Sequence, residues 1–201
     1  MVDLVDTTKV RRNERVEQLA AEAPDAYFAS AYDDELVIEG NATIGDELAA
    51  RSFDEVVVPV GGGGLISGVV RGLQRSGSRT EAIGAEPLLG NDAARSLQAG
   101  ELIKNEAEPT TIADGARTIS LGDLNWRIIR EKVKTIVEVP EEAIAEAVRL
   151  YFHLANLKCE PTGALALGAV LSDRQSFEGK RVCLVVSGGN VDASVYAKLI
   201  A

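Results

Sequence analysis

The sequence predicts an α/β fold, with a mainly parallel open sheet and helices on both of its faces. Short runs of apolar, often β-branched residues alternate along the chain with longer segments of helical periodicity. Parallel strands need crossover connections of this kind, and strands covered on both faces are apolar throughout. A third observation is the stretch VVVPVGGGGLISG at residues 56–68, in which an apolar strand passes through four glycines into a helix.

The N-terminal part of the chain alternates in the same way. Pro24 ends the first predicted helix, because proline cannot continue the helical hydrogen-bond ladder. The expected order is a strand at residues 2–6, a helix from a cap at Thr7 or Thr8 to about residue 22, a short strand at residues 26–32, and a helix at residues 34–50.

The rest of the chain continues the pattern with its most regular elements. Pro140 suits the first turn of a helix, where its missing N–H costs nothing. The expected strands are residues 56–60, 80–86, 135–139 and a buried strand at 181–186. The expected helices follow residue 64 and occupy residues 91–100, 126–133, 140–156 and 162–171, with a last helix after Gly188.

Composition excludes several classes of function. The 201 residues include 31 acidic and 21 basic side chains, a net charge of −10, which argues against a nucleic-acid partner. No apolar run reaches the roughly 18 residues that a membrane span needs, and no signal peptide is recognisable. We therefore expect a cytoplasmic protein without a membrane partner.

The four consecutive glycines at residues 61–64 (the glycine loop) point to an anionic ligand. The Walker pattern fails, because Leu65 and Ile66 stand where it requires Lys and Ser or Thr. A dinucleotide fingerprint fits only loosely. A simple turn needs one or two glycines, and each further glycine costs about 0.5–1 kcal/mol of backbone entropy. Four backbone N–H groups converging at a helix start would bind a phosphate.

A second candidate site follows the predicted strand near the C-terminus, in SGGNVD at residues 187–192. Ligands of parallel α/β sheets bind at the carboxyl ends of the strands, so this turn and the glycine loop can face one pocket. Two further segments, TIADG at residues 111–115 and EPTGA at residues 160–164, place small and polar residues at expected loops. Taken singly, each of them is typical of a turn.

Taken together, five motifs resemble the serine/threonine dehydratase and serine racemase family of pyridoxal-phosphate enzymes. They are VVPVGGGGLISG, GAEP, TIADG, EPTGA and VSGGNVD, in this order and at these spacings. The resemblance covers nearly the whole chain. It implies the large domain of the tryptophan synthase β-like fold at residues 34–201, preceded by a remnant of the small domain at residues 1–33.

The resemblance also implies a cofactor, pyridoxal phosphate, and the residues that bind it. Its phosphate would be held by Gly61, Gly62, Gly63 and Gly64 with the amide of Leu65, and its pyridine nitrogen would pair with the Ser187 hydroxyl. A neutral hydroxyl does not hold a pyridinium proton as a carboxylate would, so the cofactor becomes a moderated electron sink. Such a sink favours elimination of a β-hydroxyl over long-lived carbanion chemistry.

A divalent cation site is implied in the same way. Its protein ligands would be the carboxylates of Glu86 and Asp92 and the backbone carbonyl of Gly90. With several waters they would form a hard oxygen shell suited to Mg²⁺, Mn²⁺ or Ca²⁺. The alternative interpretation is that Asp92 is simply a favourable first-turn residue of the following helix.

One departure from the family concerns the lysine that forms the Schiff base with the cofactor. In the family it lies N-terminal to every motif found in this chain. None of the seven lysines is in the expected lysine motif: Lys9, Lys104, Lys132, Lys134, Lys158, Lys180 and Lys198. We therefore expect this chain to be the C-terminal part of the enzyme and to be inactive alone, without a catalytic residue of its own.

The function implied by the resemblance is a dehydratase, or ammonia-lyase. It would convert a β-hydroxy amino acid such as serine, threonine or hydroxyaspartate into a keto acid and ammonia, as a homodimer. Serine racemisation is the nearest alternative, because it uses the same parts. A non-catalytic phosphate-binding or partner subunit also remains open. Ser30, Ala31 and Tyr32 replace the residues usual in the family close to the expected cofactor edge.

Overall fold

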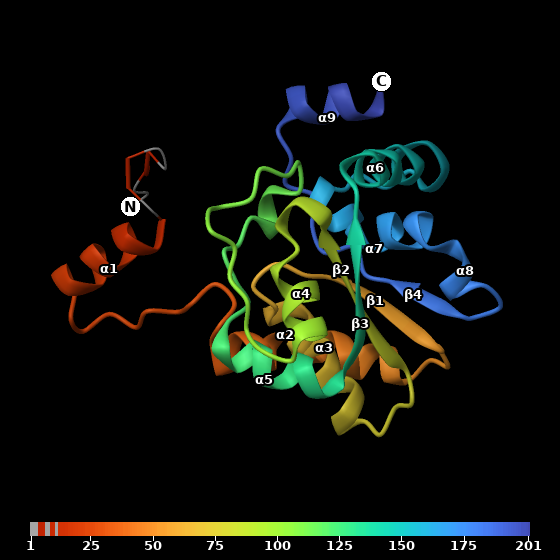
Figure 1. Cartoon of the computed structure of the whole chain (residues 1–201), viewed down its shortest axis with the longest axis horizontal. Helices are drawn as coiled ribbons and strands as arrows, with labels where there is room; N and C mark the ends of the chain where they lie inside the picture. The colour runs from red at the N-terminus through yellow and green to blue at the C-terminus, as the bar shows by residue number, and fades with distance from the viewer. Residues whose placement is uncertain (1–3, 7–8, 11) are drawn as a thin grey trace. The chain divides into compact units, whose positions relative to one another are not determined.

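The computed structural model describes residues 4–6, 9–10 and 12–201. The chain divides into two compact units, Met1–Ser30 and Ala31–Ala201. The first unit contains helix α1 (Arg12–Glu22), and the second contains a sheet with its helices (Figure 1). All the residues proposed for cofactor and cation binding lie in the second unit.

Four parallel strands form the sheet of the second unit, in the order β3-β2-β1-β4. Val57 of β1 lies between Ile83 of β2 and Leu184 of β4. Each strand therefore points the same way, and the loops that follow the strands gather at one edge of the sheet. The strands are β1 (Glu55–Pro59), β2 (Glu81–Pro87), β3 (Val133–Val139) and β4 (Val182–Leu184).

Helices connect the strands and follow the last of them. They are α2 (Glu35–Ala49), α3 (Gly64–Arg75), α4 (Asp92–Ala99), α5 (Asp123–Lys132), α6 (Glu141–Ala155), α7 (Pro161–Ser172), α8 (Arg174–Phe177) and α9 (Ala193–Ile200). Two short 3₁₀ helices occupy Leu88–Gly90 and Asp114–Ala116. None of the helices described here combines the length and the apolar character needed to cross a membrane.

The helices cover both faces of the sheet, with α3 and α5 on one side and α6 and α7 on the other (Figure 1). Val56 of β1 belongs to the core cluster that contains Ile66 of α3 and Ile129 of α5. Its neighbour Val57 points to the opposite face and joins the cluster that contains Leu165 of α7. Burial on both faces explains why residues 56–60 of this strand and its end are an unbroken apolar run instead of an alternating one.

The predicted fold class is confirmed, and so are most of the predicted elements of residues 34–201. The strand predicted at residues 26–32 is wrong: this segment has no strand partner and consists of bends and irregular backbone. The strand predicted at residues 2–6 lies partly outside the described residues, and its described part, residues 4–6, forms no strand. The caps predicted at Thr7 or Thr8 lie outside the described residues. Pro140 is the N-cap of α6 and precedes its first turn.

The last strand, β4, differs from the prediction of a buried strand at residues 181–186. It is an edge strand with only three paired residues, and residues 182–186 are all half-buried although they read VCLVV. By contrast, all five residues of β1 are buried. An apolar run of this kind predicts a strand with neighbours on both sides, but within the described residues β4 has a neighbouring strand on one side alone.

Candidate functional site

The glycine loop occupies the carboxyl end of β1 and leads directly into α3. Gly63 is the N-cap of this helix and has φ of 92°, a left-handed conformation that side chains other than glycine rarely adopt. The backbone N–H groups of residues 61–66 have no hydrogen-bond partner within the described part of the chain. Several of these residues are buried. Unpaired buried N–H groups at a helix N-terminus form a site for an anion.

The surroundings of the loop explain why it cannot carry side chains. A Cβ atom on Gly62 would lie 2.2 Å from Cγ of Tyr32, whose ring covers that glycine. A Cβ on Gly64 would lie 2.8 Å from the carbonyl oxygen of Tyr32. On its other side the loop approaches residues 115 and 116, because a Cβ on Gly61 would lie 3.1 Å from Cα of Ala116. The glycines therefore allow neighbouring backbone to pack directly against the loop.

The structure brings the other motifs of this edge close to the loop. The N–H of Gly115 in TIADG donates to Oγ1 of Thr162 in EPTGA, at 3.0 Å. The N–H of Glu160 in turn donates to the carbonyl of Gly188, at 3.1 Å, and a Cβ on Gly163 would lie 2.5 Å from that carbonyl oxygen. The segments identified in the sequence as separate turns therefore form one contiguous surface at the carboxyl ends of β1 and β4.

Ser187 lies in this surface, directly after β4. Its side chain is exposed and makes no hydrogen bond with a described residue. The adjoining Gly188 lies against the carboxylate of Glu160, since a Cβ there would be 2.5 Å from Oε1 of Glu160. The Ser187 hydroxyl is thus free to donate to, or accept from, a ligand atom at the edge of the sheet.

Glu86 and Asp92, two of the predicted cation ligands, lie at the end of β2 and the start of α4. The Glu86 carboxylate accepts from the N–H groups of Ala93 and Ala94, at 3.0 and 2.9 Å, so it caps α4 from outside the helix. Oδ1 of Asp92 accepts from Nδ2 of Asn105 at 2.8 Å. Both residues are buried. Two buried carboxylates are therefore adjacent.

The electrostatics of this pair suits a cation. Burial, with repulsion from Asp92, raises the pKa of Glu86 well above its ordinary value. Burial also raises the pKa of Asp92 to about 7. Oδ2 of Asp92 is buried and has no hydrogen-bond partner in the described part of the chain. The described residues contain no cluster of three or more His, Cys, Asp or Glu side chains arranged for a metal. A cation here would need carbonyl oxygens and water in addition to the two carboxylates.

Sequence reasoning missed one buried residue beneath the glycine loop. Asn125 of α5 is fully buried, and its Nδ2 donates to the carbonyls of Gly62 and Tyr32, at 2.9 Å each. Nothing in the local sequence LGDLNW distinguishes this asparagine, because its partners are 63 and 93 residues away. The one feature of the sequence that points to this region is Tyr32, a partner of Asn125, which departs from the family pattern.

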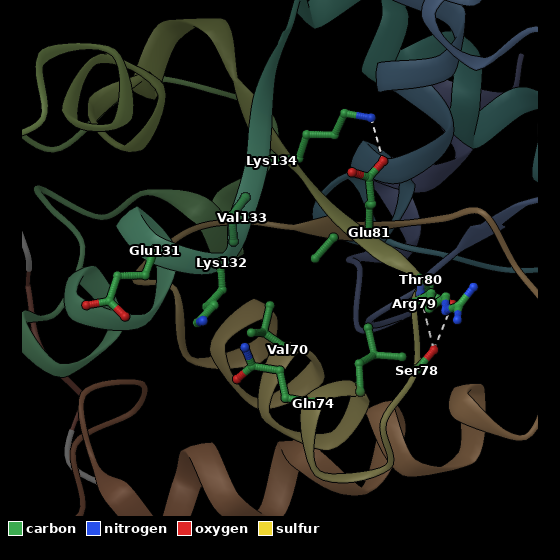
Figure 2. A pocket seen from close by; sticks show the side chains of 12 residues that line it. Val70, Gln74, Ser78, Arg79, Thr80, Glu81, Glu131, Lys132, Val133 and Lys134 are labelled. Atoms are coloured by element: carbon green, nitrogen blue, oxygen red, sulfur yellow. Dashed lines mark hydrogen bonds and ion pairs between the residues drawn. The ribbon is translucent and has the colours of Figure 1, made fainter.

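A cavity of about 360 Å³ lies elsewhere, at the amino ends of β2 and β3 (Figure 2). Its wall includes Arg79, Glu131 and Lys132, and Lys134 forms an ion pair with Glu81 there. None of the motif residues proposed for the cofactor or the cation lines this cavity. We therefore place the candidate site at the carboxyl ends of the strands, where the unpaired N–H groups are.

Comparison with known proteins connects this geometry to a family. The family model described as "Pyridoxal-phosphate dependent enzyme" matches residues 2–188. The L-threo-3-hydroxyaspartate ammonia-lyase of Pseudomonas sp is 36% identical over 189 residues, which are 93% of this chain and 59% of the relative. The serine racemase of Arabidopsis thaliana is 41% identical over 170 residues, 80% of this chain and 50% of the relative.

Solved structures give the same result for the fold. A threonine deaminase from T.th. superposes with a TM-score of 0.84 at 41% identity, over 91% of this chain and 63% of that one. Maize serine racemase superposes with a TM-score of 0.86 at 31% identity, over 94% of this chain and 61% of that one. The chain thus spans between half and two thirds of the length of these relatives.

Proposed function

This chain belongs to the family of pyridoxal-phosphate dependent enzymes, and from that premise we propose that it is the cofactor-binding part of an ammonia-lyase. The substrate would be a β-hydroxy amino acid such as hydroxyaspartate, serine or threonine, and the products a keto acid and ammonia. The observation that carries this proposal is the row of backbone N–H groups at residues 61–66, at the carboxyl end of β1, which have no hydrogen-bond partner among the described residues.

The glycine loop would bind the phosphate of the cofactor. The N–H groups of residues 61–64 and of Leu65 would donate to its oxygens, and the positive end of the α3 dipole would add to the attraction. Pyridoxal phosphate, when bound, supplies an electron sink that stabilises negative charge at the α-carbon of an amino acid. Binding of its phosphate group by the loop would orient the cofactor relative to the rest of the site.

Ser187 would contact the pyridine nitrogen of the cofactor. Its exposed hydroxyl lies in the turn after β4 and is held near the edge of the sheet by the contact between Gly188 and Glu160. A hydroxyl is neutral, so Ser187 would not stabilise a protonated ring as a carboxylate would. A neutral partner of this kind would support elimination of a β-hydroxyl group, the reaction that we propose.

We further propose that Glu86, Asp92 and the carbonyl of Gly90 bind a divalent cation. The support is the buried Oδ2 of Asp92, which has no partner among the described residues, and the burial that raises the pKa of both carboxyl groups, since a bound cation would favour their charged forms. Mg²⁺, Mn²⁺ or Ca²⁺ should raise the melting temperature of the wild-type chain, and removal of the ion with a chelator should reverse the change. The same titration on Asp92→Asn should give no shift. An equal shift in both proteins would contradict the proposal.

The lysine that carries the cofactor would come from outside the residues described here. None of the seven lysines matches the family's lysine motif. The half-buried apolar residues of β4 support this proposal, because they offer an unpaired strand edge to further polypeptide. After incubation with pyridoxal phosphate and borohydride, we expect no stoichiometric adduct on any one lysine. A single fully modified lysine would contradict the proposal.

Residues 1–33 would belong to a small domain and residues 34–201 to the large one, and the complete protein would form a homodimer. Exposed apolar side chains support association: Leu154 is 78% exposed and Val195 45% exposed. Light scattering on the purified protein tests the dimer, and the mass of a single chain would contradict it.

The activity is tested by measuring keto acid and ammonia from hydroxyaspartate, serine and threonine with the complete gene product. Release from at least one substrate is the expected result. Chiral analysis of serine in the same reactions tests racemisation, which the 41% identity to a plant serine racemase favours as the second candidate. Cofactor binding without turnover of any substrate would contradict both activities and support a non-catalytic subunit.

A further inference from the structure

Asn125 lies directly beneath the glycine loop and touches it through a buried hydrogen bond. Nδ2 of Asn125 is 2.9 Å from the carbonyl oxygen of Gly62, and the backbone N–H of Gly122 donates to the same oxygen at 3.0 Å. Both partners of Nδ2 are carbonyl oxygens, which only accept, so the orientation of the amide is unambiguous. The carbonyl of Gly62 is therefore held from one side by two donors.

This arrangement fixes the direction of the next N–H group in the loop. The peptide bond between Gly62 and Gly63 is planar and trans, so its C=O and its N–H point in opposite directions. Holding the carbonyl of Gly62 toward α5 therefore turns the N–H of Gly63 away from α5. That N–H is among those without a partner within the described residues. It belongs to the row at the start of α3 where the phosphate would bind.

A second hydrogen bond connects the same asparagine to Tyr32, the residue that covers the loop. The other hydrogen of Nδ2 donates to the carbonyl of Tyr32, whose ring lies over Gly62. The adjoining Asp33 accepts from the N–H groups of Asp123 and Leu124, at 3.0 and 2.9 Å, and so caps α5. The Asn125 amide thus binds both the glycine loop and Tyr32, whose ring covers the loop. An amide is suited to this place because it has two donor hydrogens.

We propose that Asn125 is a positioning residue for phosphate binding: by holding the carbonyl of Gly62 it orients the N–H of Gly63 toward the phosphate group of the ligand. The inference rests on the proposed function of the glycine loop. It goes beyond that function by assigning phosphate recognition to a residue that does not touch the ligand. Removing the Asn125 side chain should weaken the binding of a phosphate ester. It should leave the contacts that the protein makes with the pyridine ring of the ligand unchanged.

The test uses the full chain with pyridoxine 5′-phosphate and pyridoxine. Neither has an aldehyde, so neither reacts with surface lysines, and the ratio of their affinities isolates the phosphate contribution. Wild-type protein should prefer the phosphate ester in isothermal titration. No preference in the wild type would contradict the proposed function of the loop itself. A preference in the wild type makes the variants decisive for Asn125 alone.

Asn125→Leu replaces the amide with an apolar side chain of similar size. It should reduce the preference for the phosphate ester about tenfold, the effect of losing one to two net hydrogen bonds. Ile129→Val is the matched control, because Cδ1 of Ile129 also lies beneath the loop, 2.9 Å from the position of a Cβ on Gly63. This control lowers stability without removing a donor, so its preference should equal that of the wild type.

Two results would overturn the inference. One is an unchanged preference in Asn125→Leu, and the other is an equal reduction in Ile129→Val, which would show a general loss of stability. If Asn125→Leu does not fold, Asn125→Ala takes its place in the titration with the same expected loss, and amide NMR of the wild-type chain tests separately whether Gly63 belongs to the phosphate site. The Gly63 amide should shift on addition of pyridoxine 5′-phosphate, whereas the amides of Gly68 and Gly72 in α3 should not. Binding without a shift of Gly63 would also overturn the inference.

Discussion

At the scale of single residues, the site depends on glycines at positions where a side chain would not fit. Gly62 has to lack a Cβ because the Tyr32 ring occupies its place, and Gly63 has to adopt a positive φ to begin α3. Neither requirement applies to Gly40, which is exposed on α2 and has nothing within 4 Å of its Cβ position. The two kinds of glycine should respond differently to the same substitution.

Gly62→Ala should destabilise the chain by about 1–3 kcal/mol, because the added methyl group collides with Tyr32. It should also abolish preferential binding of pyridoxine 5′-phosphate. Gly40→Ala, the control, should stabilise the chain by up to about 1 kcal/mol through helix propensity and should bind normally. Urea denaturation and titration measure both effects. Equal stability of Gly62→Ala and wild type would show that Tyr32 does not cover the loop.

Glu55 is a buried charge at the opposite end of the sheet. Its carboxylate accepts from Nζ of Lys180 at 2.8 Å and of Lys134 at 3.1 Å, and its side chain is 3% exposed. Burial opposes its ionisation, but the two ammonium groups outweigh burial and hold the pKa of Glu55 below its ordinary value. A lowered pKa in the folded state stabilises the protein above the pKa of the unfolded chain. That stabilisation is lost as the pH falls through the folded-state pKa.

Glu55→Gln should therefore lower the free energy of unfolding at neutral pH by about 1–2 kcal/mol. The difference from wild type should shrink as the pH falls through the lowered folded-state pKa of Glu55, because the wild-type carboxylate then becomes protonated. Glu81→Gln is the control: its carboxylate pairs with the same Lys134 but is 52% exposed, so its loss should have little effect. A difference for Glu55→Gln that does not depend on pH would contradict this account.

At the scale of elements, the N-terminus of α5 organises the site. The segment at residues 32–33 docks there through Asn125 and through the capping carboxylate of Asp33, and so covers the glycine loop. Asp34, the next residue, caps α2 in the same way, at 2.8 Å from the N–H of Leu36. Two adjacent aspartates thus cap the N-termini of two different helices, α5 and α2, and α5 lies beneath the loop.

Asp33→Ala and Asp34→Ala should each reduce stability by about 1 kcal/mol, the typical cost of losing an N-cap. Asp33→Ala should also weaken binding of pyridoxine 5′-phosphate, because Tyr32 loses its anchored neighbour. Asp34→Ala should bind like the wild type. Thermal unfolding and titration of the two variants test this difference. Equal affinities in both variants would show that the cap of α5 does not contribute to the site.

At the scale of the whole molecule, the parallel α/β architecture of residues 34–201 could be predicted from the sequence. The apolar runs were long enough to identify β1, β2 and β3, and the motifs placed the loops at one edge. The resemblance to the serine/threonine dehydratase and serine racemase family is confirmed by the family model and by relatives over most of the chain. The local sequence was sufficient to predict the fold and the family, because each motif is a contiguous segment of the chain.

The features that could not be predicted depend on contacts between distant segments. Residues 26–32 have the composition of a strand but no strand to pair with, so they form none. The run VCLVV predicts a buried strand, and this prediction is wrong because burial depends on a neighbouring strand that the sequence of the run does not specify. Asn125 was missed because its partners lie 63 and 93 residues away. The site residues and the cation remain predictions.

A crystal structure of this chain with pyridoxal phosphate tests the central claim most directly. We predict the phosphate group at the N-terminus of α3, within hydrogen-bond distance of the N–H groups of residues 61–65. The Ser187 hydroxyl should lie at the pyridine nitrogen, and the aldehyde carbon should be bonded to no lysine of the chain. A phosphate group bound elsewhere, or a covalent bond from the cofactor to one of the seven lysines, would contradict the account.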